Sequence, residues 1–355
     1  MKDSVTAKQI EATIALFITG SSLVTGSPTQ AGQDTWLCLA AAFVLNIPML
    51  YIHSQIIELY PGRNYFDNII KACGKPAGKA LCALLLIYSL HIMAFVTKTF
   101  CAFIQTVSMP ETPFVFITLS ILLVAFYICK KRVGVLASVA KFSLPFLLLT
   151  VAMTLILAYK DFDFSNLKPT LQSGMQPLVK GTVLLFTLPF GESVLCAPLF
   201  CTLDKKEKVF PVFLKGMLIG FAVVLAANLR NLLILGAAEK MFTFPSYEAV
   251  SVIKIGDFFT RIEVVIGFNL LLAGFVKASV AYFACCSNVQ KIFDFEDYPP
   301  LLAPCALVIV TIIMLFSANT EELFGWLKYH AAFALPFQVI IPAAALTVGR
   351  IRKKA

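Results

Sequence analysis

Charged residues, histidines and metal-binding patterns are scarce in this chain. Only 14% of its 355 residues are Asp, Glu, Lys or Arg, and the three histidines form no HExxH or other paired set. The ten cysteines show no CxxC spacing, and most lie inside apolar stretches, where cysteine serves as a small packing residue. No nucleophile stands beside a positioned base. These absences predict a protein that has no metal site, needs no cofactor and is not an enzyme.

The formal net charge of +9 does not indicate a nucleic-acid partner, because the basic residues are spread over short polar segments and do not cluster with aromatic residues. What the chain has in excess is apolar surface. Hydrophobic residues make up 59% of it, and the mean hydropathy is +0.85, well above that of soluble globular proteins. The composition predicts an all-α polytopic protein that lies in a lipid bilayer.

Ten stretches are long enough to cross the bilayer, since a membrane-spanning helix needs about 20 apolar residues. They occupy residues 9–26, 36–59, 81–107, 114–129, 136–158, 180–202, 209–236, 262–288, 301–318 and 330–349. Because little chain remains for a soluble domain, residues 1–355 are predicted to form a single transmembrane domain. The longest outer connection, residues 237–261, is predicted to hold a short amphipathic helix after Pro245 with Ser246 as its N-cap, either as a lid or as a packing element.

Basic residues predict the orientation of the chain. With the N-terminus in the cytoplasm, the cytoplasmic segments hold 17 lysines and arginines, and the opposite side holds 6. Because basic residues concentrate in cytoplasmic loops, both termini are predicted to be cytoplasmic. Residues 289–299 are an exception, since this segment carries three acidic residues and a single lysine.

Two of the ten stretches are interrupted by residues that disfavour a continuous helix. The first holds Gly-Ser-Ser at residues 20–22, and the sixth holds Pro-Phe-Gly-Glu at residues 189–192. Unwound backbone survives in hydrocarbon only where protein, water or a ligand satisfies it. The interruptions occupy matching positions in two sets of five stretches, residues 9–158 and 180–349, as in inverted-repeat transporters with a midplane site. The sequence thus predicts a five-plus-five inverted repeat in which helices 1 and 6 are discontinuous.

Charged residues deep in these stretches are candidates for the site, because burying a charge at mid-membrane costs about 2.5 to 3.5 kcal/mol. Glu192 lies in the sixth stretch, and Lys98, Arg230 and Lys277 lie in the third, seventh and eighth. One acid against three bases leaves positive charge that a ligand carboxylate could neutralise. Alternatively, Glu192 pairs with Lys98 or Lys277 only to hold helices together, and Arg230 is a structural charge. Lys141 either extends to the interface or provides a fixed ammonium where sodium-coupled transporters bind their ion.

Helix ends at the two interruptions would add complementary partial charges. Free N–H groups at Gly20, Ser21 and Ser22 would hold a carboxylate. Free carbonyl groups around Phe190 and Gly191, beside the acidic side chain that follows them, would hold an ammonium group. A molecule that carries both groups is a zwitterion, so the predicted ligand is an amino acid.

Several strings in fixed order resemble the spore germination permease family, the B-type subunits of endospore germinant receptors in the amino acid/polyamine/organocation superfamily. They are GSS (20–22), AGQDTW (31–36), YPGR (60–63), CGKPAGK (73–79), MPETP (109–113), FGE (190–192), RNLLILG (230–236), PSYEAVSVIKIGDFFTRIE (245–263) and FVKAS (275–279). The resemblance covers nearly the whole chain. It places GSS, FGE, Arg230 and Lys277 on the family's first, sixth, seventh and eighth helices.

The resemblance implies a ten-helix inverted-repeat fold with its pocket between helices one, three, six and eight. It also implies partners, a larger A-type subunit and a lipoprotein C-type subunit, in the cell membrane or spore inner membrane of an endospore-forming bacterium. The implied function is to bind a small nutrient germinant, an amino acid, and to signal germination to these partners. Two alternatives stay open: a proton-coupled amino acid transporter, and a scaffold subunit with a vestigial pocket.

Overall fold

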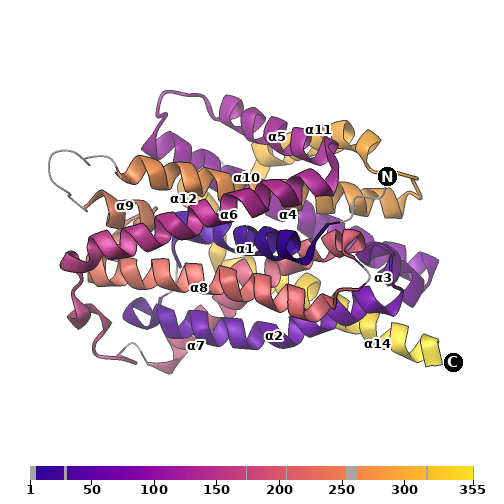
Figure 1. Cartoon of the computed structure of the whole chain (residues 1–355), viewed down its shortest axis with the longest axis horizontal. Coiled ribbons are helices and arrows are strands. Elements are labelled where there is room, and N and C mark those ends of the chain that lie inside the picture. The colour runs from indigo at the N-terminus through magenta and orange to yellow at the C-terminus, as the bar shows by residue number, and fades with distance from the viewer. Residues whose placement is uncertain are drawn as a thin grey trace.

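The computed structural model describes residues 5–27, 30–172, 174–204, 206–252, 262–316 and 319–354. Within these ranges the chain is almost wholly helical, and one parallel bridge between Val5 and Leu203 is the only β pairing. The helices run along the long axis of a single bundle, and both termini lie at the same end (Figure 1). The predicted all-α fold is confirmed.

The helices are named in chain order. The α-helices are α1 (Ala7–Thr25), α2 (Thr35–Leu59), α3 (Tyr65–Cys73), α4 (Lys75–Val107), α5 (Phe114–Lys130), α6 (Arg132–Leu157), α7 (Met175–Leu185), α8 (Val209–Leu235), α9 (Pro245–Ser251), α10 (Ile262–Ile292), α11 (Leu302–Phe316), α12 (Thr320–Gly325), α13 (Leu327–Leu335) and α14 (Ile341–Lys354). Two wider π segments, η4 (Phe186–Phe190) and η8 (Pro336–Ile340), and a tighter 3₁₀ segment, η5 (Gly191–Thr202), continue α7 and α13.

Each of the ten predicted stretches corresponds to one helix or to a run of helical pieces. Eight runs in the described residues are long and apolar enough to cross a membrane: Gly32–Leu59, Lys75–Val107, Arg132–Asp161, Met175–Thr202, Val209–Met241, Gly267–Ile292, Pro299–Phe316 and Leu327–Lys353. Helix α5 is apolar but shorter. The number of crossings, the inverted repeat and the single-domain organisation stay predictions.

The outward faces of α6 and α11 are covered by large apolar side chains. Ile156 on α6 is 74% exposed, and Leu307 and Leu315 on α11 are 72% and 81% exposed. In water, a continuous apolar surface of this kind would drive aggregation. Against lipid tails it carries no such penalty, so the exterior suits a multi-pass membrane protein.

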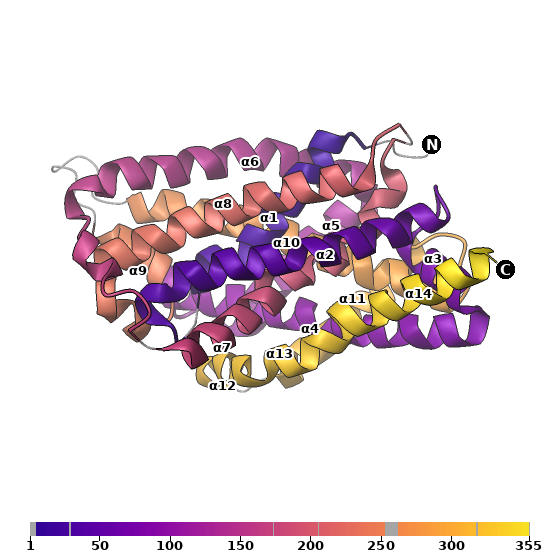
Figure 2. The ribbon, with the colours of Figure 1, turned by 90° about the horizontal axis from the view of Figure 1, so that it is seen from below.

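Helix α1 lies in the centre of the bundle, between α6, α8 and α10 (Figures 1 and 2). Every residue from Ala12 to Thr25 is buried. Two glycines on α8 allow the close approach: a Cβ on Gly216 would lie 2.8 Å from Ile14 Cβ, and a Cβ on Gly220 would lie 2.9 Å from Ile18 Cβ. Small residues four positions apart let transmembrane helices pack backbone to backbone.

We expect Gly220→Ala to lower the free energy of unfolding by about 1 to 3 kcal/mol, because the added methyl group overpacks the contact between α1 and α8. Gly325→Ala is the control, since a Cβ at Gly325 meets nothing within 4 Å. Thermal unfolding of the purified protein in detergent measures both variants. Equal melting temperatures for the two would contradict this contact.

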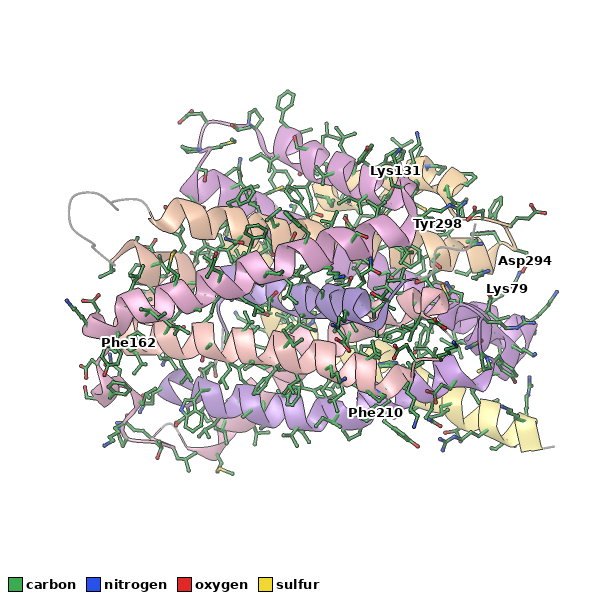
Figure 3. All side chains as sticks on the ribbon, in the orientation of Figure 1. Lys79, Lys131, Phe162, Phe210, Asp294 and Tyr298 are labelled. Atoms are coloured by element: carbon green, nitrogen blue, oxygen red, sulfur yellow. The ribbon has the colours of Figure 1, made fainter. Side chains whose placement is uncertain are left out.

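Ion pairs join the acidic segment at residues 289–299 to α4 and α6, at the end of the bundle that carries both termini. Lys79 Nζ lies 2.6 Å from Asp294 Oδ2 (Figure 3), and Arg132 Nη2 lies 2.6 Å from Asp297 Oδ2. The hydrogen bond from Lys79 also lowers the pKa of the Asp294 carboxyl group. The acidic segment at residues 289–299 therefore supplies partners for basic residues on neighbouring elements, which explains its departure from the basic character of this end.

Candidate functional site

The sixth predicted stretch is broken in its middle, as the sequence predicts. Helix α7 ends at Leu185, and Leu188 has extended backbone angles (φ −137°, ψ 111°) inside η4. Pro189 follows, and its ring nitrogen has no N–H to continue a helical ladder. The chain resumes at Gly191 as the 3₁₀ segment η5.

The first predicted stretch is not broken, so the predicted discontinuity of helix 1 is wrong. Helix α1 runs without interruption from Ala7 to Thr25. Its hydroxyl side chains fold back on the helix: Ser22 Oγ donates to the Ile18 carbonyl at 3.2 Å, and Thr25 Oγ1 donates to the Ser21 carbonyl at 3.1 Å. These bonds use carbonyl groups of the helix itself. Because α1 is continuous through residues 20–22, the N–H groups there bond to carbonyl groups one turn earlier, and the predicted row of free N–H groups is absent.

Gly20 has a packing role. A Cβ at this position would lie 3.0 Å from the Ala273 carbonyl oxygen and 3.1 Å from Lys277 Cβ on α10. The missing side chain lets α1 and α10 approach closely, as small residues do between membrane helices. This approach brings the side chain of Lys277 beside the next residue of α1, Ser21.

Three of the predicted site residues form one buried group at the broken segment. Lys277 Nζ on α10 lies 2.5 Å from Glu192 Oε2 on η5, and it donates to Ser21 Oγ on α1 at 2.5 Å. The side chains of Lys277 and Glu192 are both 0% exposed. The ring of Phe17 lies 5.0 Å from the same ammonium group. The group joins three helices through one complementary pair of charges.

The side chain of Gln338, on η8, forms hydrogen bonds at the broken segment. Its Nε2 donates to the Thr187 carbonyl at 2.8 Å and to Tyr88 Oη on α4 at 2.6 Å. A Cβ at Gly191 would lie 2.1 Å from Gln338 Oε1, so only glycine allows this amide to lie against the broken segment. Gln338 thus satisfies a carbonyl group that the break releases, and Gly191 makes room for it.

Polar atoms remain unsatisfied around this group. Among the described residues, Glu192 Oε1, Ser193 Oγ and Gln338 Oε1 are buried and have no hydrogen-bond partner. An unsatisfied polar atom in an apolar medium costs about 1 to 3 kcal/mol. The two carbonyl-type oxygens, Glu192 Oε1 and Gln338 Oε1, can each accept a hydrogen bond, and the Ser193 hydroxyl group can donate or accept one. They lie near the Lys277 ammonium group, which already has partners.

Three further predicted residues, Lys98, Lys141 and Phe190, take no part in this buried group. Lys98 is buried on α4 with its Nζ 5.2 Å from the centre of the Phe114 ring, at the start of α5. Lys141 is exposed on the outer face of α6. Phe190 is buried and packs edge-on against Phe43, with ring centres 6.1 Å apart. Of the predicted set, the structure brings Ser21, Glu192 and Lys277 together around the break.

Arg230 belongs to a separate polar cluster. Its guanidinium group donates to Thr154 Oγ1 on α6 at 2.8 Å, to Asn231 Oδ1 at 2.8 Å and to the Ser246 carbonyl on α9 at 3.3 Å. A cavity of about 20 Å³ adjoins it, lined also by Asn269, and this is room for about one water molecule. Arg230 joins α6, α8 and α9.

We expect Arg230→Lys to lower the free energy of unfolding by about 2 to 4 kcal/mol, because one ammonium group cannot reach three acceptors that the planar guanidinium group reaches. Arg350→Lys, at an exposed position near the C-terminus, is the control. Chemical or thermal unfolding in detergent gives the comparison. Equal stability of Arg230→Lys and wild type would contradict a stabilising role for the three hydrogen bonds of the guanidinium group.

The outer connection differs from its prediction. Helix α9 begins at Pro245 with Phe244 as its N-cap, so the prediction of Ser246 as N-cap is wrong. Ser246 is buried, and its hydroxyl group accepts a hydrogen bond from Asn231 Nδ2 at 2.9 Å. Helix α9 packs against α1, α8 and α10. Residues 253–261 lie outside the described residues.

Sequence reasoning missed Gln338, Tyr88 and Thr187. A signal existed for Gln338, which is an amide in an otherwise apolar stretch two residues after a proline, the same kind of interruption that marks the sixth stretch. No signal existed for Tyr88, because a tyrosine in a membrane helix is common. Its role depends on which helices meet, which a single sequence does not show.

Comparisons with known proteins identify relatives of the whole chain. The model of the spore permease family, described as spore germination protein, matches residues 4–321. Spore germination protein KB of Bacillus subtilis (strain 168) is 26% identical over 365 aligned residues, which cover 99% of this chain and 96% of that protein. Spore germination protein XB of Bacillus anthracis is 21% identical over 85% of this chain and 83% of its own length.

The fold resembles that of a solved transporter. The structure of Mhp1, a nucleobase-cation-symport-1 family transporter in a closed conformation with bromovinylhydantoin bound, superposes with a TM-score of 0.71 and 13% sequence identity. The superposition covers 96% of this chain and 78% of that chain. At this identity the likeness shows the fold and nothing about the ligand.

Proposed function

This chain belongs to the family of spore germination proteins, and we propose that it is the integral-membrane subunit of a spore germinant receptor. In this proposal the chain binds a small nutrient, an amino acid, at the buried group of Ser21, Glu192 and Lys277. It then signals germination to partner subunits. The proposal goes beyond family membership, and it depends on the chemistry of that group.

The observation that carries the proposal is the buried pair of Lys277 and Glu192 at a broken membrane helix. An amino acid has one carboxylate and one ammonium group. Its carboxylate would accept from Lys277 Nζ and Ser21 Oγ, and its ammonium group would donate to Glu192, whose Oε1 has no partner among the described residues. One internal ion pair is then exchanged for two pairs with the ligand. The net charge of the site stays zero, so no buried charge is left uncompensated.

Binding in this way requires two arrangements of the bundle. In the structure Lys277 and Glu192 are in contact and have no exposed surface, which corresponds to a closed arrangement. An amino acid that separates the two side chains binds only the open arrangement, and such differential affinity is what shifts a conformational equilibrium. The break at residues 188–190 lets η5 move without bending a continuous helix. Partner subunits in contact with this chain would respond to this movement of η5.

We propose as partners an A-type and a lipoprotein C-type subunit, in the cell membrane or the spore inner membrane of an endospore-forming bacterium. Both termini would face the cytoplasm. Two observations support this topology: the termini lie at one end of the bundle (Figure 2), and basic residues are concentrated at that end.

A proton-coupled amino acid transporter is the second candidate, favoured by the fold shared with a solved transporter. Counterflow in proteoliposomes separates the two functions. A transporter exchanges labelled amino acid across the membrane at the rate of ordinary carriers, and a receptor subunit binds it without exchange. Exchange at carrier rates would replace the receptor proposal with this one.

Two adjacent serines test the receptor proposal. We expect Ser21→Ala to raise the amino acid concentration for half-maximal germination about tenfold, because it removes one hydrogen bond to a charged ligand group. Ser22→Ala is the matched control, since its hydroxyl group bonds to Ile18 within α1. Spores that carry each variant with its partner subunits are exposed to the twenty L-amino acids in turn. Equal effects of the two variants would contradict a ligand site at Ser21.

A further inference from the structure

A large cavity opens at the end of the bundle opposite the termini. Its volume is about 800 Å³, and it lies between the end of α1, the C-terminal half of α7, the short helix η6 (Gly236–Met241) and the start of α13. Figure 2 shows α7, α12 and α13 together at this end, away from the N and C labels. The cavity is distinct from the buried group of Ser21, Glu192 and Lys277, because none of these three residues lines it.

Three lysines line this outer cavity, namely Lys180, Lys240 and Lys328. All three are exposed, and none forms an ion pair with any residue in the described ranges. No aspartate or glutamate of the described chain lines the cavity. The three lysines lie on different elements, α7, η6 and α13. Three ammonium groups from separate elements therefore line one space, and Glu239, which precedes Lys240 in the chain, compensates part of this charge.

Most of the other residues in the wall are apolar or aromatic. Leu184, Phe242, Phe324 and Leu327 form much of it. A cleft with low-dielectric walls and charge of one sign focuses its field and raises the local concentration of opposite charge. Apolar walls add favourable contacts for hydrocarbon groups. The combination selects a molecule that has negative charge and a small hydrocarbon body.

A neighbouring cavity of about 540 Å³ continues the same space, since both are lined by Thr25, Gln30, Lys240 and Phe242. The neighbouring cavity adds one acid, Glu239, and one further base. Over the two cavities, positive charge remains in excess.

We propose that the outer cavity is a binding site for a small organic anion, of the dicarboxylate class. This site goes beyond the proposed function, because the excess of lysines over acids in the two joined cavities attracts a net negative charge, which a zwitterionic amino acid lacks. The site also adjoins the inner group: Thr25 lies about one helical turn beyond Ser21 on α1, and Leu184 on α7 lies just before the break. An anion held there occupies the space between the outer solution and the broken helix.

Isothermal titration calorimetry of the full chain in nanodiscs of neutral lipid tests the proposal, with succinate as the probe. Succinamide, which has nearly the same shape and no charge, is the matched compound. We expect succinate to bind and succinamide not to bind. We also expect affinity to fall as ionic strength rises, because exposed charges are screened by salt. Equal binding of both compounds, or no binding of either, would overturn the proposal.

Variants locate the site. We expect the triple variant Lys180→Gln, Lys240→Gln and Lys328→Gln to weaken succinate binding at least about tenfold. The control triple variant Lys130→Gln, Lys160→Gln and Lys206→Gln removes the same charge from exposed positions that line neither cavity. Equal loss in both would mean that net charge alone attracts succinate, and this would overturn the proposal. Loss of succinate binding in nanodiscs that contain phosphatidylglycerol would show instead that a lipid headgroup takes the site.

Discussion

Replacing Lys277 by methionine lowers the free energy of unfolding by about 3 to 5 kcal/mol, the largest effect that we expect from any single substitution. The cause is Glu192, whose side chain is 0% exposed and would lose its charged partner. Removing one member of a buried pair leaves the other desolvated without compensation. Thermal unfolding in detergent measures the loss. Lys141→Met is the control, because Lys141 is exposed on α6 and exposed substitutions change stability by about 0.5 kcal/mol or less.

A double variant separates structure from function. Replacing a whole buried ion pair by apolar side chains is often neutral or stabilising, so Lys277→Met with Glu192→Leu should recover most of the lost stability. If the pair binds the ligand, this stable double variant no longer responds to amino acids. If the chain is a scaffold with a vestigial pocket, the double variant supports germination like wild type. A double variant that is less stable than Lys277→Met alone would contradict the pairing itself.

Replacing Gly191 by alanine has the second-largest expected effect. The new Cβ would lie 2.1 Å from Gln338 Oε1 and 2.5 Å from Gln338 Cδ. The amide must then move, and its bonds to Tyr88 Oη and the Thr187 carbonyl are lost. Overpacking and an unsatisfied carbonyl group together cost about 2 to 4 kcal/mol. We expect a lower melting temperature and a weaker response to amino acids.

Substituting Gln338 as well shows whether contact with this amide causes the loss of stability in Gly191→Ala. In Gln338→Ala the amide is absent, so adding Gly191→Ala should cost almost nothing more. The two substitutions would thus show a coupling energy of about 1 to 3 kcal/mol. Gly267→Ala, where a Cβ meets nothing within 4 Å, gives the baseline for alanine in a membrane helix. Additive effects of Gly191→Ala and Gln338→Ala would show that the amide does not pack on Gly191.

The two predicted breaks show how far the sequence determines backbone structure. Pro189 interrupts a helix for a covalent reason, because it lacks an N–H group, so the break beside it could be predicted. Gly20 has no such constraint. A glycine in a membrane helix either weakens the helix or lets another helix approach, and the structure shows the second, with Lys277 Cβ 3.1 Å from the added Cβ position. Local sequence cannot separate these two uses of glycine.

The same limit applies to the buried charges. Glu192, Lys98, Arg230 and Lys277 could be recognised as intramembrane charges, because each lies in an apolar stretch. The sequence gives their depth along a helix but not the direction in which each points. Only Lys277 faces Glu192, whereas Arg230 faces α6 and α9. The contribution of Gln338, from the far end of the chain, depends on the same helix packing.

The pairing of charges changes how the ligand site should be understood. The sequence predicts an excess of positive charge at mid-membrane, which a ligand carboxylate would neutralise. The structure has a balanced pair at the break, with the other bases elsewhere. In our proposal the ligand replaces an existing partner on each side, so ligands with only one charged group bind poorly. This selectivity follows from the cost of an uncompensated charge in a buried site.

The central claim is that an amino acid binds by taking the place of each partner in the Lys277–Glu192 pair. A thermal-shift screen of the twenty L-amino acids on wild type and on the double variant Lys277→Met with Glu192→Leu tests it most directly. We predict that at least one amino acid stabilises wild type, by about 2.7 kcal/mol at a hundred times its dissociation constant, and that it leaves the double variant unchanged. The same shift in both proteins, or no shift with any amino acid, would contradict the account.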